Sequence, residues 1–374
     1  MNILFFVSSL NAGGAERVAV TLANAWAGQG HRVTLVPTYG KKSESFYELG
    51  PDVRVHWLID TIVGSVLYRR ARYAGKLLAV RKTIRREQPD VVVSFLTNVN
   101  VTVLAASIGL NVPVVVCERT NPSASRHSRG ALHALRKILY PRASAICVQT
   151  SAAEAYFQAR LGKNLPLFVI PNPLPDALGG GPRASLNADA MGRYRLVALG
   201  RLVPEKQFSH LIRVFAGLAK QFPDWDLWVY GEGPERTQLE SLIQQFDLNQ
   251  RIFLPGTTAN PWDVLREGSL FAMTSRVEGF PNVLLEAMGC GLPCIAYDCP
   301  SGPSEIMEGG RAGVLVPLND EQGYASALGA LMANPGTRRQ LGQLALQRVL
   351  QRFSRPVVLT QWSQMFSKVG VRHD

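Results

Sequence analysis

One stretch of the sequence, Glu278-Gly279-Phe280-Pro281-Asn282-Val283-Leu284-Leu285-Glu286, carries two carboxylates on either side of a predicted turn and helix start. We expect Asn282 to cap that helix and to leave the backbone N–H groups of Val283 and Leu284 free at its positive end, where a phosphate can bind. Glu286 could accept hydrogen bonds from ribose hydroxyls, and Glu278 could reach sugar hydroxyls. An ordinary capped helix would also use Asn282, but it has no need of Glu278 ahead of the turn.

A second group of residues follows the predicted strand 195–199, where the chain reads Gly200-Arg201-Leu202-Val203-Pro204-Glu205-Lys206. Arg201 and Lys206 would place two cations at the end of that strand, and a diphosphate can bridge two such cations. On their own, the same side chains are explained equally well as solvated charges in a loop.

Paired glycines, Gly13 and Gly14, lie between the first predicted strand and a helix. Glycine there lets a ligand approach the backbone, and the helix start offers N–H groups to an anion. The spacing is not G-x-G-x-x-G, so a dinucleotide site is not indicated. A tight turn between a strand and a helix also uses glycine for geometry alone.

The elements that position these residues follow from short apolar runs that alternate with longer helical patterns, as is typical of parallel sheets covered on both faces. The expected strands are 3–8, 33–37, 91–95, 112–117, 145–148, 195–199, 226–230, 252–254, 270–274, 293–296 and 312–316. The predicted fold class is α/β, with two doubly wound, Rossmann-like domains that face a central cleft. Ligands in such sheets bind beyond the carboxyl ends of the strands.

A segment rich in proline and glycine marks the boundary between the two domains, because it suits neither a helix nor a central strand. We expect an N-terminal domain over 1–170, a linker over 171–186 and a second domain over 187–352. A C-terminal helix within 353–374 is expected to return toward the first domain.

The charge is distributed unevenly: residues 1–180 carry 21 Lys and Arg against 10 Asp and Glu, whereas residues 181–374 carry 19 against 18. A basic first half indicates a polyanionic partner, either nucleic acid or an anionic membrane surface. The stretch 68–86 reads as a basic helix, and near one of its faces fall the apolar residues Leu67, Ala71, Ala74, Leu78 and Ile84. We expect its cations to face a membrane: Arg69, Arg70, Arg72, Lys76, Arg81, Lys82, Arg85 and Arg86. A solvated face packed on the sheet explains any single helix equally well.

The remaining composition points to a chain that works inside the cell. No run of 18 apolar residues could span a bilayer, and no basic residue precedes the apolar start, which argues against a secretory signal. The odd count of five cysteines favours reduced thiols, and we expect Cys290, Cys294 and Cys299 to be buried small hydrophobic residues rather than metal ligands.

Taken in their order and at their strand ends, these motifs resemble the retaining glycosyltransferases of family 4, which have the two-domain GT-B fold. The resemblance runs from Gly13-Gly14-Ala15-Glu16 through Gly200-Arg201 and Lys206 to Glu278 and Glu286, and so covers nearly the whole chain.

The resemblance implies catalytic roles for Arg201 and Lys206, which would hold the donor diphosphate, and for Glu278, which would contact the donor sugar. Glu286 would bind the ribose. Gly13, Gly14 and the amides of Gly279, Phe280, Pro281, Asn282, Val283 and Leu284 would complete the substrate site. The resemblance implies no metal, because the family is metal-independent. It also implies no cofactor, and the UDP-sugar is the donor substrate. The pair Asp224 and Asp226 has the spacing of metal-dependent transferases, but it lies at the wrong end of its strand.

The sequence departs from the family after the strand 112–117, where members often carry a histidine and this chain reads Glu118-Arg119-Thr120-Asn121. Arginine cannot act as a base at neutral pH, so the role of that histidine does not transfer. Arg119 and Asn121 are instead expected to bind substrate, and no catalytic base is assigned.

A closer similarity is to bacterial transferases that extend glycans on undecaprenyl diphosphate, including the N-acetylgalactosaminyltransferases of N-glycan assembly. It rests on the short stretches Gly13-Gly14-Ala15-Glu16-Arg17, Glu44-Ser45-Phe46-Tyr47-Glu48-Leu49 and Val93-Ser94-Phe95-Leu96. It implies a UDP-sugar donor, with an N-acetylhexosamine as one candidate, a lipid-diphosphate-linked glycan acceptor, and a place on the inner face of the cytoplasmic membrane. A second basic patch, Arg126, Arg129, Arg136, Lys137 and Arg142, could add to the membrane contact or grip the acceptor diphosphate.

Three other functions fit part of the pattern. A UDP-sugar 2-epimerase shares the architecture, and a two-lobed ligand-binding protein also places its ligand between two α/β domains. A nucleic-acid binder would account for the charge, but it would leave the two glutamates unexplained, so nucleic acid is not an expected partner.

Overall fold

The computed structural model describes residues 1–39, 44–62, 72–119, 131–162, 165–180 and 183–371. They form two compact units: unit 1 contains residues 1–173 and 358–374, and unit 2 contains residues 174–357. Each unit is built on one parallel sheet, which confirms the predicted α/β fold class.

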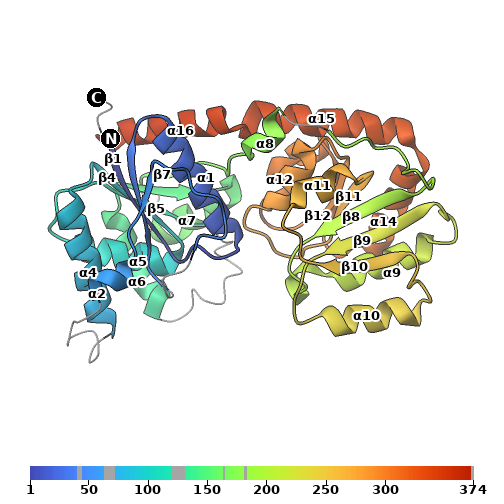
Figure 1. The fold of residues 1–374 in the computed structure, drawn as a ribbon, viewed down its shortest axis with the longest axis horizontal. Helices are drawn as coiled ribbons and strands as arrows, with labels where there is room; N and C mark the ends of the chain where they lie inside the picture. Colours follow the sequence, from blue (N-terminus) through green and yellow to red (C-terminus); the bar gives the residue numbers. More distant parts are fainter. Residues whose placement is uncertain (40–43, 63–71, 120–130, 163–164, 181–182, 372–374) are drawn as a thin grey trace. The chain divides into compact units, whose positions relative to one another are not determined.

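Unit 1 has the strand order β3-β2-β1-β4-β5-β6-β7 in its described part, of which Figure 1 labels β1, β4, β5 and β7. The strands are β1 Asn2–Val7, β2 Arg32–Pro37, β3 Val53–Val55, β4 Val91–Phe95, β5 Val114–Cys117, β6 Ala145–Val148 and β7 Leu167–Val169. The helices are α1 Gly14–Gly28, α2 Leu58–Ile62, α4 Arg72–Glu87, α5 Thr97–Ser107, α6 Ala131–Leu139, α7 Ser151–Leu161 and α16 Arg355–Lys368, and η2 is a 3₁₀ turn over Tyr140–Arg142.

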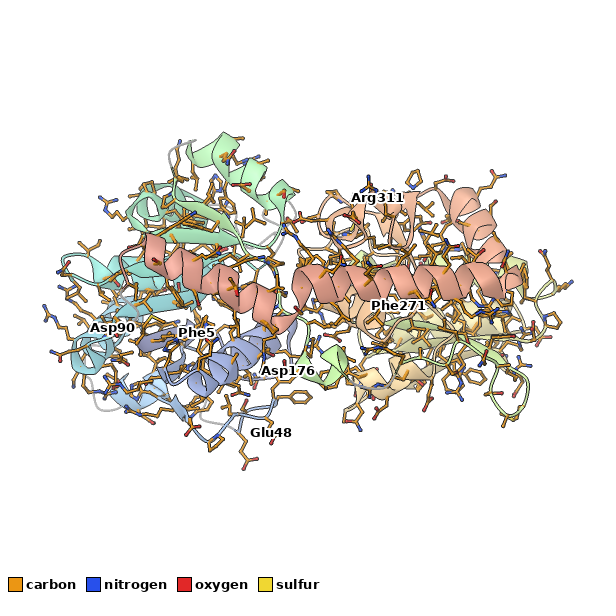
Figure 2. All side chains as sticks on the ribbon, turned by 90° about the horizontal axis from the view of Figure 1, so that it is seen from above. Phe5, Glu48, Asp90, Asp176, Phe271 and Arg311 are labelled. Atoms are coloured by element: carbon orange, nitrogen blue, oxygen red, sulfur yellow. The ribbon has the colours of Figure 1, made fainter. Side chains whose placement is uncertain are left out.

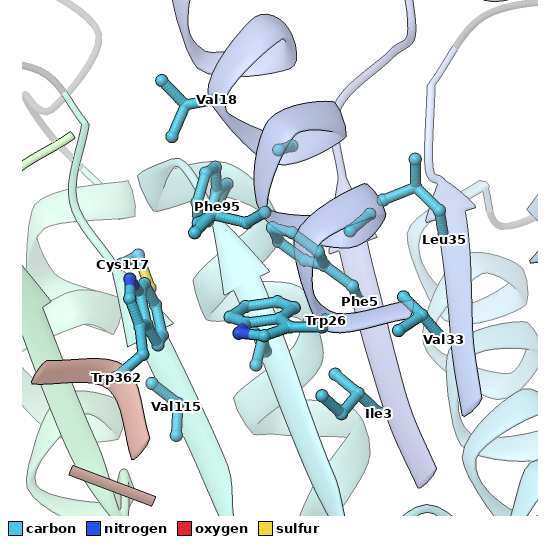
Figure 3. Close-up of a cluster of buried hydrophobic side chains, with 14 of the residues drawn as sticks. Ile3, Phe5, Val18, Trp26, Val33, Leu35, Phe95, Val115, Cys117 and Trp362 are labelled. Carbon is cyan, nitrogen blue, oxygen red and sulfur yellow. The ribbon is translucent and has the colours of Figure 1, made fainter. Parts of the chain in front are cut away.

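Successive side chains of the central strands of unit 1 enter two different apolar cores, because a strand points alternate residues to opposite faces. Phe5 of β1 belongs to the core beneath α1 and α16, and Phe6 to the core beneath α4 and α5. Trp26 of α1 meets Trp362 of α16 edge to face, with ring centroids 5.2 Å apart (Figure 3). The last helix of the chain therefore supplies part of the core of unit 1.

Unit 2 has the strand order β10-β9-β8-β11-β12-β13 in its described part. The strands are β8 Tyr194–Leu199, β9 Trp225–Tyr230, β10 Ile252–Gly256, β11 Leu270–Met273, β12 Cys294–Asp298 and β13 Val314–Pro317. The helices are α8 Asp176–Gly179, α9 Phe208–Leu218, α10 Arg236–Gln245, α11 Pro261–Arg266, α12 Asn282–Gly289, α13 Pro303–Ile306, α14 Glu321–Ala333 and α15 Pro335–Phe353, and 3₁₀ turns cover η3 Pro204–Lys206 and η4 Glu308–Gly310.

The sheet of unit 2 also separates two cores, one beneath α9 and α14 and one beneath α12 and α15. Phe271 of β11 is fully buried in the second of these cores (Figure 2). Figure 2 also labels Glu48, an exposed residue in a loop of unit 1. Leu174 and Leu178, from the segment rich in proline and glycine, are buried in the same core. Residues 174–180 of this segment therefore pack as part of unit 2, whereas residues 171–173 belong to unit 1.

Candidate functional site

The turn before α12 is held by contacts on both sides. The hydroxyl of Ser301 donates to the carbonyl oxygen of Gly279 at 2.9 Å, and a Cβ on Gly302 would lie 2.4 Å from Cδ of Pro281. Phe280 is 7% exposed and packs edge to face on Phe353. Its side chain anchors the turn in the core, so only its backbone can meet a ligand.

The start of α12 differs from the prediction. The helix begins at Asn282 with Pro281 as its N-cap residue, and no side chain caps it. The carbonyl oxygen of Pro281 accepts hydrogen bonds from the N–H groups of Leu284 at 3.1 Å and Leu285 at 3.2 Å. The prediction was wrong in making Asn282 the cap and in leaving the Leu284 amide free, because the first turn is tightened by the Pro281 carbonyl. Val283 is half-buried, and the positive end of the helix dipole still lies at this turn.

Lys206 and Glu278 form an ion pair next to this turn. The Lys206 ammonium nitrogen lies 2.5 Å from Oε1 of Glu278, and the two side chains are 20% and 11% exposed. The hydroxyl of Thr274 donates to the carbonyl oxygens of Lys206 at 3.0 Å and Gln207 at 3.1 Å. The end of β11 therefore fixes the 3₁₀ turn that carries the cation.

The other two predicted polar residues of unit 2 lie in different environments. Arg201 is exposed directly after β8 and makes no side-chain hydrogen bond or ion pair with the described residues. Glu286 lies in the second turn of α12 and is 2% exposed. The structure thus leaves one cation open to solvent and one carboxylate buried in the helix that follows the loop.

Two glycines that were not singled out from the sequence lie against the loop that follows β8. A Cβ on Gly231 would lie 1.8 Å from the carbonyl oxygen of Gly200, and one on Gly233 would lie 2.3 Å from that of Leu202. Gly231 also has a φ of 149°, which side chains rarely adopt. Two glycines directly after the predicted strand 226–230 were the available signal.

In unit 1, Gly13 lies against the side chain of Glu16. It is the N-cap residue of α1, and a Cβ there would lie 2.2 Å from Oε2 of Glu16. Glu16 turns back over this position, where its Oε1 accepts hydrogen bonds from the hydroxyls of Ser8 at 2.8 Å and Ser9 at 3.3 Å. Gly14 is the first residue of the helix and is exposed.

Glu118, at the end of β5, is a buried carboxyl at the centre of a polar network. It is 3% exposed and accepts hydrogen bonds from the hydroxyls of Thr97, at 2.8 Å to Oε2, and of Tyr140. Nη1 of Arg136, from α6, lies 3.9 Å away. Burial raises the pKa of Glu118 above its ordinary value. Arg119 follows in a buried position, and Asn121 lies outside the described residues.

Two family models match the chain in succession. The model for a glycosyl transferase 4-like domain matches residues 13–173, and the model for glycosyl transferases group 1 matches residues 187–348. The chain is therefore a glycosyltransferase that carries both of these domains.

Curated relatives of this glycosyltransferase include bacterial enzymes of glycan assembly. A Campylobacter jejuni enzyme described as a GalNAc-alpha-(1->4)-GalNAc-alpha-(1->3)-diNAcBac-PP-undecaprenol alpha-1,4-N-acetyl-D-galactosaminyltransferase is 26% identical over 99% of this chain and 99% of its own. An exopolysaccharide phosphotransferase of Streptomyces coelicolor is 28% identical over 97% of this chain, which spans only 40% of that protein.

Among solved structures, HepE of Anabaena in complex with UDP and glucose superimposes with a TM-score of 0.79. The match covers 98% of this chain and 99% of HepE, at 21% sequence identity. This likeness establishes the GT-B fold of the chain.

The predicted basic helix of this glycosyltransferase is only partly as expected. Arg69 and Arg70 lie outside the described residues, and Arg72 begins α4. Lys82, Arg85 and Arg86 are exposed, as a membrane-facing role requires. Leu78, which the prediction placed on one face with Ala74 and Ile84, is 54% exposed, whereas Ile84 is buried.

Lys76 was wrongly predicted to face a membrane. It is 8% exposed, and its ammonium nitrogen lies 2.9 Å from the ring centroid of Tyr39. Burial lowers its pKa to about 7, because a charged amine loses its hydration there. Arg81 is half-buried and donates from Nη1 to the carbonyl oxygens of Ala106 at 2.8 Å and Ile108 at 2.7 Å. Both cations therefore serve the packing of α4.

The described part of the chain holds neither a cluster of metal ligands nor a membrane-spanning helix. No three His, Cys, Asp or Glu side chains there are arranged to hold a metal ion, and no helix there is long and apolar enough to cross a bilayer. Asp226, whose spacing from Asp224 resembles that of metal-dependent transferases, is bound by Arg193 and Arg251 at the amino end of β9.

Proposed function

We propose that this glycosyltransferase moves a sugar, with retention of its anomeric configuration and without a metal ion, from a UDP-sugar to a glycan linked to a lipid diphosphate. One observation carries the proposal: the ion pair of Lys206 with Glu278 lies beside the turn that leads into α12, with Glu286 in the next turn. Cation, carboxylate and helix start are the groups that a nucleoside diphosphate sugar needs.

The donor diphosphate would compete with Glu278 for the Lys206 ammonium group. When its phosphates bind Lys206, Glu278 is released to accept hydrogen bonds from the sugar hydroxyls. Arg201 supplies a second cation from the loop after β8, where solvent exposure leaves it available to the ligand. Charge that develops on the departing UDP is then met by two cations and a helix dipole already in place.

The relatives support the choice of acceptor. The C. jejuni relative, which matches over nearly its whole length, acts by its description on a glycan carried by diphospho-undecaprenol. An acceptor of the same chemical class fits the basic character of residues 1–180. An N-acetylhexosamine is the first donor sugar to test.

A place on the cytoplasmic face of the membrane is proposed from the surface of unit 1. On α4, Tyr73 is 86% and Leu78 is 54% exposed, on the same helix as exposed Lys82, Arg85 and Arg86. On α6, Leu135 is 44% and Ile138 is 58% exposed. Apolar side chains among cations are typical of a surface that lies on anionic lipid.

The test is transfer from each UDP-sugar to lipid-diphosphate acceptors, with the product followed by mass. We expect Lys206→Ala and Glu286→Gln to reduce transfer at least 100-fold, since each removes a contact to the donor, while both variants keep the wild-type melting temperature within a few degrees. Lys220→Ala, which removes an exposed lysine elsewhere in unit 2, is the control and should transfer normally.

Three results would contradict the proposal. Wild-type rates in either site variant would remove the donor site from this loop. Inversion of the anomeric configuration in the product would remove the retaining mechanism. Conversion of a UDP-sugar to its 2-epimer in the absence of acceptor would assign a different reaction.

A further inference from the structure

Arg119 is a buried cation at the carboxyl end of β5. It is 9% exposed, and the carbon of its guanidinium group lies 3.8 Å from the ring centroid of Phe95, the last residue of β4. Nη1 donates to Oδ1 of Asn172 at 2.7 Å. Nε and Nη2 are buried and make no hydrogen bond to an oxygen or nitrogen of the described residues, and the neighbouring Cys117 offers the guanidinium group only a weak sulfur acceptor.

No carboxylate neutralises this charge. Glu118, its neighbour in the chain, is held by Thr97, Tyr140 and Arg136, and no described carboxylate lies within 4.0 Å of the Arg119 guanidinium group. The nearby thiol of Cys147 stays neutral, because burial holds its pKa well above the ordinary value. A buried charge without a partner destabilises a fold, and arginine cannot escape the cost by losing its proton.

The surroundings nevertheless fix the guanidinium group in one orientation. Asn172, which follows β7, also accepts a hydrogen bond from Nε2 of Gln149, at the end of β6, at 2.7 Å. The ends of β4, β5, β6 and β7 thus contribute Phe95, Arg119, Gln149 and Asn172. Nε and Nη2 share the edge of the guanidinium group that takes two oxygens of a phosphate in parallel.

We propose that Arg119, oriented by Phe95, Gln149 and Asn172, is an anion-binding site for a phosphate group of a substrate diphosphate. The inference rests on the proposed function, in which donor and acceptor both carry a diphosphate. Because Nε and Nη2 are buried, an anion must displace neighbouring atoms to contact them. It then supplies the counter-charge that the guanidinium group lacks.

The first test compares the stability of the full chain without ligand. Arg119→Met should leave the melting temperature unchanged or raise it, because it removes an uncompensated buried charge. Arg338→Met is the matched control, since Arg338 is 1% exposed but donates from Nη1 to the carbonyl oxygens of Leu331 and Met332. It should lower the melting temperature. A comparable fall for Arg119→Met would make Arg119 a structural residue and overturn the proposal.

The second test measures binding of UDP and of geranyl diphosphate by titration calorimetry, which needs no turnover and so separates this inference from the transfer reaction. Arg119→Met should weaken one of the two ligands about 10- to 100-fold, as expected for hydrogen bonds to a charged group. A loss for geranyl diphosphate alone assigns the site to the acceptor, and a loss for UDP alone assigns it to the donor. Asn172→Ala, which keeps the charge but frees its orientation, should weaken the same ligand less. Unchanged affinity for both ligands in Arg119→Met would overturn the proposal.

Discussion

Two buried ionisable residues of unit 1 differ in the partners that surround them, and so in their effect on stability. Glu118 is buried with two hydroxyl donors and an arginine nearby, whereas Lys76 is buried with an amine that has no hydrogen-bond partner among the described residues. The ring face of Tyr39 offsets only part of the cost of the Lys76 charge. The two residues should therefore respond in opposite ways to removal.

We predict that Lys76→Met stabilises the protein at pH 6 to 7, by about 1–3 kcal/mol. The pKa of Lys76 is lowered to about 7 from the ordinary 10.5, so between these values the unfolded chain binds more protons than the folded one. Stability of the wild type then rises with pH across this window, and the cost of Lys76 is largest below pH 7. The gain from Lys76→Met should shrink as the pH approaches 10.5. Urea unfolding at a series of pH values measures it, and a gain independent of pH would contradict the assignment.

At the scale of elements, the close contact of two loops in unit 2 is set by glycine. We predict that Gly231→Ala costs about 3 kcal/mol or more, because the added carbon would lie 1.8 Å from the Gly200 carbonyl oxygen at a positive φ. Gly217→Ala, near the end of α9 with open space around it, is the control and should be neutral or stabilising by up to about 1 kcal/mol. Thermal unfolding of both variants checks this, and equal melting temperatures would show that the loops separate readily.

Helix α4 carries the test of membrane contact. We predict that Lys82→Glu with Arg85→Glu weakens sedimentation with anionic liposomes at least tenfold, because each exposed cation contributes about 1 kcal/mol near such a surface. The same reversal at Arg339, exposed on α15 of unit 2, should have no effect. Binding of UDP should be unchanged in both. Loss of UDP binding in the α4 variant would show that these cations serve the substrate site instead.

Periodicity in the sequence was enough for most of the strands but not for the orientation of helices. Runs such as 91–95 and 270–274 are predominantly apolar, with Ser94 and Thr274 as the exceptions, because both faces of a parallel sheet are covered, and they correspond to β4 and β11. Strands β3 and β7 have three residues each and were missed, since so short a run shows no pattern. Lys76 was misplaced because the apolar stem of a lysine can pack inward, which periodicity of charge does not reveal.

The sequence was enough to predict which residues belong to the candidate site, but not the contacts that those residues make. Lys206 and Glu278 were identified from their positions at strand ends, but their ion pair joins residues 72 apart in the chain. The capping of α12 by the Pro281 carbonyl depends on local backbone geometry, and Asn282 is the better cap by composition. The contact of Arg119 with Asn172 likewise depends on how the ends of β5 and β7 come together.

At the scale of the molecule, the chain passes from unit 1 to unit 2 and returns. We expect the two units to unfold as separate transitions, because each has apolar cores of its own. Their apolar cores share no residue, and Trp362 and Phe366 near the end of the chain belong to unit 1. Removal of the Trp362 or Phe366 side chain should therefore lower the stability of unit 1, to which residues 1–173 also belong.

We predict that Trp362→Ala lowers the stability of unit 1 by about 3–5 kcal/mol, because it leaves a cavity against Trp26. UDP at 100 times its dissociation constant should raise the stability of unit 2 by about 2.7 kcal/mol. Scanning calorimetry with and without UDP distinguishes the two effects, since each should move a different transition. Leu344→Ala, at a position 39% exposed on α15, is the control and should move neither by more than a degree or two. If Trp362→Ala moved both transitions together, the units would unfold as one, and the last helix would couple the proposed donor site to the stability of the basic unit.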